Sequence, residues 1–542
     1  MDKSPHLRLF VVLLFLASLG VTPLLAAPTP TWSYTATSDI KWFKLAPTGH
    51  LIVSTDGALL GVDPESGQPA WTSEELKDLD EEKFDIVEGT QFAVITKGKG
   101  AFGSKTLLIL LDLSTGKEAW TTESIGMTGN NGHFLLMETS AMLLYGPTGK
   151  NANDRDMLVV DLGTGKEIWR NEEFFKKFKP ELVASGKTKM TLTGNQTPLF
   201  DSDETMIVFW SKDGIRKLNA KTGAIIWTTP LKCDRAPASA YGYGNMMLND
   251  DKSVLFAPYE KTMVAVSTKD GSLLWKKPPQ LKGQVYQMDL TPDGLVVKGG
   301  PNSEGKEGDN FITVLDPATG DVKWKKPFDK LKLCSSYVLK DGKIIVYTDE
   351  KLYGINISDA QATVLAKDVK FNGGEIPGRL TLTDKGYTLQ SSQNLMMLGF
   401  DGSRVFHTYY KAPGSSLFSK IASTTAIMAV NVASAADGYS RAVNNAYANG
   451  GSGSASYSLI TGNPYMSKRF KATANGQSFM SMLTDVKSDA GNGPGLVKVN
   501  KLTGATTTQI VLGTKKPEYE LDDVEGRLFF LSDDKKVDCF AF

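Results

Sequence analysis

A short pattern of apolar and polar positions recurs along most of the chain. Each copy has a mostly apolar run, a polar turn built on Thr-Gly or Asp-Gly in most copies, and then a tryptophan. The six clear copies end at Trp71, Trp120, Trp169, Trp227, Trp275 and Trp324. These tryptophans are 49, 49, 58, 48 and 49 residues apart, and a near-constant period of this size indicates an array of equivalent structural units.

One copy shows what the unit is. The apolar run 158–162 suits a buried strand, and Gly165 supplies the positive φ that a tight reversal needs. The chain then returns to Trp169, as in a β-hairpin. Two further strand-like runs precede it, at 133–137 and 141–146. Four short antiparallel strands in about 40–50 residues are typical of a β-propeller blade, and blades stack radially because a lone blade cannot bury both faces.

The repeated tryptophans and glycines are the residues to which we assign structural roles. A large indole at the end of each fourth strand is well placed to fill the space between two blades, since one aromatic side chain buries roughly 150–250 Å². We predict that the six tryptophans dock between blades; a row of exposed tryptophans that recognise ligands is the alternative. The predicted turn glycines are Gly67, Gly116, Gly165, Gly223, Gly271, Gly320 and Gly504.

The phrase L-x-x-L-D-x-x-T-G-x-x-x-W resembles the repeat of the PQQ-like (quinoprotein-type) β-propellers. In that family Thr-Gly makes the turn and the tryptophan docks between blades. Poorer copies without the tryptophan continue at 353–365, 396–408 and 497–510, so the resemblance covers roughly residues 32–411 and 465–542.

The two ends of the chain predict how the ring closes. Residues 519–542 contain three strand-like runs, and residues 31–39 supply one strand that carries Trp32. Pairing these segments would complete a blade and leave no open edge. Nine phrases and the closing blade give ten units, whereas eight blades is the usual number for the family that the repeat resembles. We predict an all-β fold: a single propeller of eight or more four-stranded blades, closed by the N-terminal strand.

One late segment breaks the pattern. Residues 416–449 are rich in alanine, and their apolar residues recur at spacings of three and four, which predicts one or two helices. A Gly/Ser linker follows at 450–456. We interpret residues 412–460 as an insertion that caps an apolar surface of the ring, with a partner-binding role as the alternative.

Residues 1–27 have the pattern of a secretory signal peptide, with a basic start, an apolar core at 9–21 and a small-residue cleavage region. The expected mature domain is 28–542, periplasmic or secreted. No cysteine lies near the signal, so a lipoprotein anchor is not expected, and no later stretch is apolar for long enough to span a membrane. The expected mature protein is therefore soluble.

Charge and cysteine content narrow the function. Sixty basic and sixty acidic residues give zero formal net charge, which argues against a nucleic-acid binder. The three cysteines, Cys233, Cys334 and Cys539, are few for an exported chain, so its stability must come from the core. Buried free thiols are favoured over one disulfide and an odd thiol.

Catalytic motifs are sparse. The resemblance implies PQQ and calcium for a quinoprotein dehydrogenase, together with adjacent cysteines, but the sequence has no Cys-Cys pair. His50, His133 and His407 are isolated, and the polar stretches 151–156 and 488–493 are better explained as turns than as calcium loops. We assign no catalytic residue or metal ligand and expect no cofactor, with PQQ plus calcium as the alternative.

The sequence favours a non-catalytic, monomeric scaffold in the bacterial cell envelope that binds other envelope or secreted proteins. The resemblance implies this interpretation, because PQQ-like propellers are used in outer-membrane protein assembly. The alternative is a PQQ-binding or other ligand-binding protein, enzyme or sensor, that uses the central channel. A polysaccharide-related binder or enzyme is a third possibility.

Overall fold

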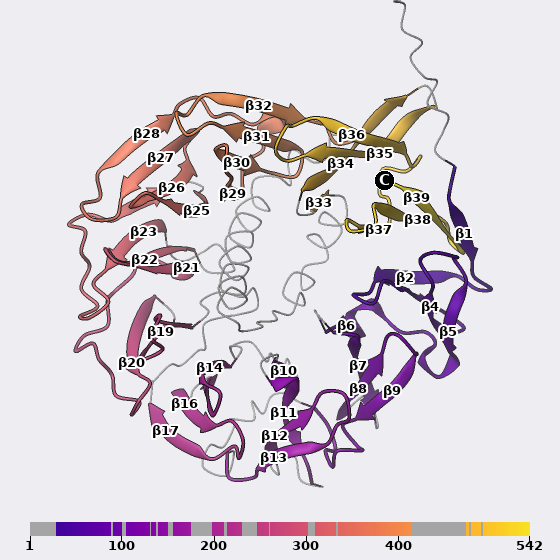
Figure 1. The fold of residues 1–542 in the computed structure, drawn as a ribbon, viewed down its shortest axis with the longest axis horizontal. Coiled ribbons are helices and arrows are strands. Elements are labelled where there is room, and N and C mark those ends of the chain that lie inside the picture. The colour runs from indigo at the N-terminus through magenta and orange to yellow at the C-terminus, as the bar shows by residue number, and fades with distance from the viewer. Residues whose placement is uncertain are drawn as a thin grey trace, which may run out of the picture.

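The protein is a ring of ten antiparallel sheets, or blades (Figure 1). The computed structural model describes residues 29–87, 90–99, 105–130, 132–136, 139–149, 155–174, 198–210, 214–229, 246–259, 261–301, 309–331, 334–413, 473–475, 478–488 and 491–542. Within these residues nine sheets have four strands and one has three. Ten blades agree with the predicted all-β propeller of eight or more.

The blades follow the chain order. Blades 1 and 2 comprise β2 (Ile40–Leu45), β3 (Leu51–Thr55), β4 (Leu59–Val62), β5 (Pro69–Ser73), β6 (Phe84–Ile86), β7 (Phe92–Lys99), β8 (Lys105–Asp112) and β9 (Lys117–Thr121). Blades 3 and 4 comprise β10 (Gly132–Leu136), β11 (Ala141–Pro147), β12 (Arg155–Asp161), β13 (Glu167–Asn171), β14 (Leu199–Ser202), β15 (Thr205–Trp210), β16 (Gly214–Asn219) and β17 (Ile225–Thr229).

The second half of the ring is built in the same way. Blades 5 to 7 comprise β18 (Met247–Leu248), β19 (Val254–Tyr259), β20 (Thr262–Ser267), β21 (Gln284–Thr291), β22 (Gly294–Gly300), β23 (Asn310–Leu315), β24 (Phe328–Leu331), β25 (Cys334–Lys340), β26 (Lys343–Thr348), β27 (Lys351–Asn356) and β28 (Ala362–Ala366). Blades 8 and 9 comprise β29 (Arg379–Leu382), β30 (Tyr387–Gln390), β31 (Asn394–Leu398), β32 (Arg404–Tyr409), β33 (Thr473–Asn475), β34 (Phe479–Ser488), β35 (Gly491–Asn500) and β36 (Thr506–Val511).

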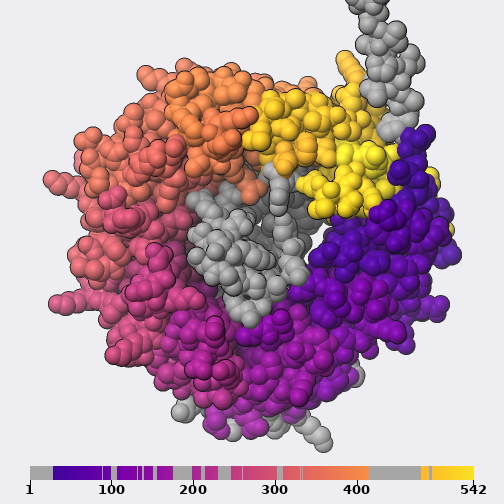
Figure 2. Space-filling model, in the orientation of Figure 1, coloured from indigo at the N-terminus to yellow at the C-terminus, as the bar shows by residue number. Residues whose placement is uncertain are grey.

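Blade 10 joins the two ends of the chain. It contains β37 (Tyr519–Asp522), β38 (Arg527–Asp533), β39 (Lys536–Ala541) and, as its fourth strand, β1 (Trp32–Thr35). β1 is antiparallel to β39, with Trp32 opposite Cys539. In the space-filling view the yellow C-terminal blade meets the indigo N-terminal strand (Figure 2). The predicted closure by the N-terminal strand is confirmed, and it leaves no open sheet edge at the ends of the chain.

The strand order gives the ring two distinct faces. In the four-stranded blades the first strand lies nearest the centre and the fourth lies on the outer rim (Figure 1). Because successive strands are antiparallel, every segment from a fourth strand to the next first strand emerges on the same face. We call this the connector face. The turns between third and fourth strands lie on the opposite face, which we call the turn face.

The core lies in the seams between neighbouring blades. One cluster joins Leu110 of blade 2 to Leu144 and Leu158 of blade 3, all fully buried. Such seams follow from the sequence, because the apolar runs place large side chains on both faces of each sheet and each face needs a neighbour to cover it.

Three short 3-10 helices, η1 (Glu74–Leu76), η2 (Glu81–Lys83) and η6 (Asn372–Gly374), lie within the described residues. The predicted signal at 1–27 and the predicted helices at 416–449 with their linker at 450–456 lie outside them. Among the described residues no helix is long and apolar enough to cross a membrane.

Candidate functional site

Each tryptophan of the repeat reaches from its own blade to the next one. Trp120 of blade 2 is buried, and its indole Nε1 donates a hydrogen bond to the carbonyl oxygen of Leu162 in blade 3, at 2.8 Å. The same contact joins Trp71 to Leu113 (2.8 Å), Trp169 to Ala220 (2.8 Å), Trp227 to Thr268 (3.0 Å), Trp275 to Pro317 (3.0 Å) and Trp324 to Ile357 (2.8 Å). Each acceptor lies within two residues of the end of a third strand, at the start of the turn.

The turn glycines lie against these indoles. Gly165 has a φ of +67°, and a Cβ added there would lie 2.5 Å from Cγ of Trp120. Glycine is therefore needed for both its backbone conformation and its lack of a side chain. The corresponding pairs are Gly116 with Trp71, Gly223 with Trp169, Gly271 with Trp227 and Gly320 with Trp275. The structure thus joins the tryptophan of one phrase to the glycine of the next.

Two further aromatic residues dock against a turn glycine of the next blade, although the repeat motif predicted this role for neither. Trp32 of β1 donates to the carbonyl oxygen of Pro64 at 2.9 Å and contacts Gly67. Phe406 of β32 occupies the equivalent place against Gly504. Trp32 could be recognised from the sequence as the tryptophan of the closing strand. Phe406 could not, because phenylalanine stands where the motif has tryptophan.

A β-bulge precedes the tryptophan on the outer strands. In blade 3, Glu167 pairs with Val160 and Trp169 pairs with Val159, so Ile168 between them has no partner on β12. Such an insertion bends the strand and changes where its side chains point. Trp169 lies in the seam while Ile168 is 45% exposed on the rim.

An acidic segment links blades 1 and 2 on the connector face. This acidic connector, residues 74–83, contains η1 and η2, and its six carboxylates belong to Glu74, Glu75, Asp78, Asp80, Glu81 and Glu82. Leu76 and Leu79 are buried in the seam between the two blades. The connector is thus anchored by apolar residues while its acidic residues face outward.

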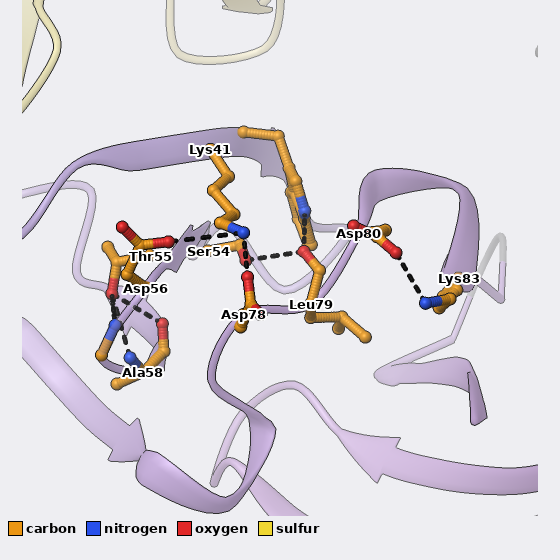
Figure 3. Close-up of polar contacts among 11 residues, drawn as sticks. Lys41, Ser54, Thr55, Asp56, Ala58, Asp78, Leu79, Asp80 and Lys83 are labelled. Carbon is orange, nitrogen blue, oxygen red and sulfur yellow. Dashed lines mark hydrogen bonds and ion pairs between the residues drawn. The ribbon is translucent and has the colours of Figure 1, made fainter. Parts of the chain in front are cut away.

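The backbone of the acidic connector is fixed by hydrogen bonds from blade 1. Trp42 Nε1 and Ser54 Oγ both donate to the carbonyl oxygen of Leu79, at 2.6 and 2.9 Å (Figure 3). The amide of Asp78 donates to the carbonyl oxygen of Thr55 at 3.0 Å. Because Trp42 lies on β2 and Ser54 on β3 of the same sheet, the backbone of the connector is held at more than one point and has little freedom to move.

Ion pairs with lysines balance part of the negative charge of the acidic connector. Lys41 Nζ forms an ion pair with Asp56 at 3.3 Å and also with Asp78, and the hydrogen bond to Asp78 is the main cause of its raised pKa (Figure 3). Lys83 Nζ lies 2.6 Å from Asp80 and lowers the pKa of that carboxyl. Within the described part of the chain, the carboxylates of Glu74, Glu75 and Glu82 have no ion pair or hydrogen bond.

The three histidines within the described residues lie on three different blades. His50, His133 and His407 have local polar partners in Thr48 (3.1 Å), Asn130 (3.4 Å) and Asn394 (2.9 Å). Burial lowers the pKa of His133 to about 4. Among the described residues, no three His, Cys, Asp or Glu side chains are grouped so as to hold a metal ion.

The cysteines show no adjacent pair. Cys334 in blade 7 and Cys539 in blade 10 are free and buried, and Cys233 lies outside the described residues. Burial raises the pKa of Cys334 to about 11, so its thiol is protonated and unreactive at neutral pH. The polar stretches 151–156 and 488–493 lie partly outside the described residues. Asp156, in the first, forms an ion pair with Arg170 at 3.0 Å.

Comparison with known proteins gives one family match. The sequence model of the family described as outer membrane protein assembly factor BamB matches residues 55–281 and 153–330, which together span just over half of the chain. A comparison with curated proteins finds no match.

Solved structures with a similar fold include BamB from Moraxella catarrhalis, at 17% identity and a TM-score of 0.33, over 70% of this chain and 96% of that one. They also include the quinohemoprotein alcohol dehydrogenase ADHIIG from Pseudomonas putida HK5, at 13% identity and a TM-score of 0.29, over 69% and 72% of the two chains.

We predict that Trp120→Ala and Trp169→Ala each lower the free energy of unfolding by about 3–5 kcal/mol, because each removes a buried indole from a seam. Ile168→Ala, at the exposed bulge, is the control and should change it by less than about 0.5 kcal/mol. Urea unfolding followed by tryptophan fluorescence and circular dichroism measures the difference. Wild-type stability in both tryptophan variants would contradict a docking role.

A pair of glycine variants separates backbone strain from contact with the indole. Gly165 and Gly342 have similar φ values, +67° and +70°, but a Cβ at Gly342 would meet no atom within 4 Å. Gly342→Ala should cost about 1–2 kcal/mol from backbone strain alone. Gly165→Ala should cost a further 1–3 kcal/mol, roughly, from overpacking against Trp120. Equal losses in urea unfolding would show that the contact does not matter.

The acidic connector should open more easily when its side-chain donors are removed. In the double variant Trp42→Phe and Ser54→Ala, the Leu79 carbonyl loses both of its side-chain hydrogen-bond donors. This should lower the free energy of opening the connector by about 1–3 kcal/mol. We expect trypsin to cleave after Lys77 roughly five- to a hundredfold faster. Cleavage after Lys117 reports global unfolding and should change much less. A parallel rise at both positions would mean that the whole ring, and not the connector, has been destabilised.

Proposed function

Because the chain belongs to the family of PQQ-like β-propellers described as outer membrane protein assembly factor BamB, we propose that it is a non-catalytic scaffold that binds other proteins of the cell envelope. The proposed place of action is the periplasm or the outside of the cell. Residues 1–27 support export by their pattern, and residues 28–542 would form the working propeller domain.

The observation that carries this proposal is the way in which the acidic connector is displayed. Its backbone is held by Trp42 and Ser54, while the carboxylates of Glu74, Glu75 and Glu82 are exposed and unpaired in the described part of the chain. A surface loop whose backbone is already ordered loses little conformational entropy on binding. Charged groups without internal partners give such a loop electrostatic selectivity for a partner.

The repeat supports the same conclusion. The seam contacts that fix each blade leave the connectors free to differ in sequence without disturbing the ring. Binding residues are often found on loops that a rigid scaffold positions. The connector face of this propeller has that arrangement, and a protein partner is the kind of ligand that can span several connectors.

The alternative function is the binding of a small ligand in the central channel. The observation that favours it is the carboxyl of Asp85 on β6, one of the innermost strands. Burial raises the pKa of Asp85 on β6, while Lys44 on β2 opposes that rise and lies 3.6 Å from Glu81. Calorimetric titration of residues 28–542 with PQQ, with and without calcium, tests this function. Saturable one-to-one binding would favour it, and no heat would favour the scaffold.

Site-specific photo-cross-linking in the native cell envelope tests the scaffold. The cross-linking residue replaces Glu75 on the connector face or Gln68 on the turn face, which lie just beyond opposite ends of β5 and are both exposed. We expect protein adducts from position 75 and few from position 68. Equal yields, or no adduct at either position, would contradict a partner surface on the connector face.

A further inference from the structure

The outer rim of blades 5 and 6 is basic. After the turn that follows each third strand, a seven-residue segment with the tryptophan of the repeat runs along the outside of the blade. These outer segments are 271–277 in blade 5 and 320–326 in blade 6, and together they hold five lysines and one aspartate. The corresponding segments of blades 1, 4, 7 and 9 hold no charged residue, at 67–73, 223–229, 360–366 and 504–510.

Both basic segments stand at the outermost position of their sheets. Leu273 forms an isolated bridge with Val266 of β20, the third strand of blade 5. Val322 does the same with Leu315 of β23 in blade 6, where the fourth strand β24 begins only at Phe328. The described residues of blade 5 contain no fourth strand. The lysines that follow these bridges therefore lie on the outer rim of the ring.

The lysine side chains extend from a fixed backbone. Trp275 and Trp324 are buried in their seams, which anchors the chain directly before the lysine pairs 276–277 and 325–326. All four of these lysines are exposed. In the part of the chain that the structure describes, none of their ammonium groups takes part in an ion pair or a hydrogen bond. Their positive charge is therefore available to an external anion.

Exposed aliphatic side chains accompany the lysines on this rim. Blades 4, 5 and 6 follow one another around the ring (Figure 1). Their outer segments expose Ile225 (37%), Ile226 (50%), Leu273 (48%), Leu274 (42%) and Val322 (44%). Apolar groups that gather at a surface and are bordered by polar groups mark a site that binds a protein or a membrane.

We propose that this rim, residues 271–277 and 320–326 with the isoleucines of blade 4, binds the surface of a bilayer that contains anionic phospholipid. Lysines draw a protein to the negative lipid phosphates, and neighbouring aliphatic side chains enter the boundary between headgroups and acyl chains. The rim offers both kinds of group side by side. This binding site is separate from the connector face and does not rest on the scaffold function.

The shape of the rim favours a bilayer over an acidic protein. The rim is convex (Figure 1), so a flat bilayer touches it along a short arc, with blade 5 at the centre and blades 4 and 6 on either side. Lipids diffuse within the bilayer and can gather beneath lysines on separate blades. A folded acidic protein would instead need carboxylates fixed at matching positions on a concave surface.

Binding through the rim leaves both faces of the ring uncovered. The ring would stand on edge, so the bilayer would cover neither the connector face nor the turn face. The acidic connector, between β5 and β6, lies on the far side of the ring from β20 (Figure 1). Its carboxylates, which anionic lipid would repel, are thereby held away from the bilayer.

Sedimentation with lipid vesicles tests the proposal. The mature chain, residues 28–542, is used because the apolar core of residues 1–27 would itself bind lipid. Vesicles of phosphatidylcholine and phosphatidylglycerol in equal parts are compared with vesicles of phosphatidylcholine alone. The lysine variant is Lys276→Glu with Lys277→Glu. Its control is Lys515→Glu with Lys516→Glu, an exposed pair between β36 and β37 whose reversal changes the net charge equally.

We expect the wild type to sediment with the anionic vesicles at about 0.1 M ionic strength. At about 1 M it should be released, because the Debye length falls from about 10 Å to about 3 Å. The lysine variant should bind at least about tenfold more weakly, whereas the control should stay within about twofold of the wild type. Because the two variants have the same net charge, the difference between them reports where the contact lies. Circular dichroism checks that both fold.

A second variant tests the apolar part of the contact. Ile226→Gln with Leu274→Gln removes two exposed aliphatic side chains and leaves every charge in place. Binding to the anionic vesicles should fall roughly three- to tenfold, because less apolar surface is buried at the headgroups. The dependence on salt should match that of the wild type, since the lysines are unchanged.

Four results would overturn the proposal: a wild type that ignores anionic vesicles, equal binding to phosphatidylcholine alone, equal losses in the lysine variant and its control, or an apolar variant that binds as the wild type does. A wild type that ignores vesicles but forms protein adducts from a photo-cross-linking residue at position 277 would assign the rim to an acidic protein instead. Vesicle binding without adducts from position 75 would support this inference and contradict the scaffold function.

Discussion

The ring depends on one contact, made by blades 1 to 6 and by the closing blade, in which the indole of one blade packs beneath the turn of the next. Trp120 shows its components: the ring is buried against Gly165, and Nε1 donates to the Leu162 carbonyl. The apolar part makes neighbouring blades adhere, while the hydrogen bond sets the height at which they meet. Because the donor has one carbonyl in reach, a blade cannot slide along its neighbour without leaving a buried N–H unsatisfied. Repeated around the ring, this contact turns separate sheets into one body.

Much of this architecture was readable from the sequence, because each phrase encodes one blade and each blade is a local structure. The period, the hairpins and the closure by the strand around Trp32 follow from patterns within a few dozen residues. The partner of each residue was not readable, since Gly165 contacts the tryptophan of the preceding phrase. The bulge at Ile168 could not be predicted from the sequence either, because it depends on how the outer strand β13 pairs with β12.

The candidate site was less predictable than the fold. In the sequence, residues 74–83 look like an ordinary charged loop, and nothing beside them indicates that Trp42 and Ser54 hold the Leu79 carbonyl. Those donors precede the connector by some tens of residues, and only the closed sheet brings them beneath it.

Closure by β1 also affects the time course of folding. The pairing of Trp32 with Cys539 joins residues that are almost a full chain length apart, so it cannot form until the last strand has been made. Contacts of such high sequence separation form late, because the entropy of closing the loop must first be overcome. Until then β1 and the outer edge of β39 are both unpaired strand edges, open to pairing with other chains. The final step of folding is therefore also the step at which the protein becomes safe from aggregation.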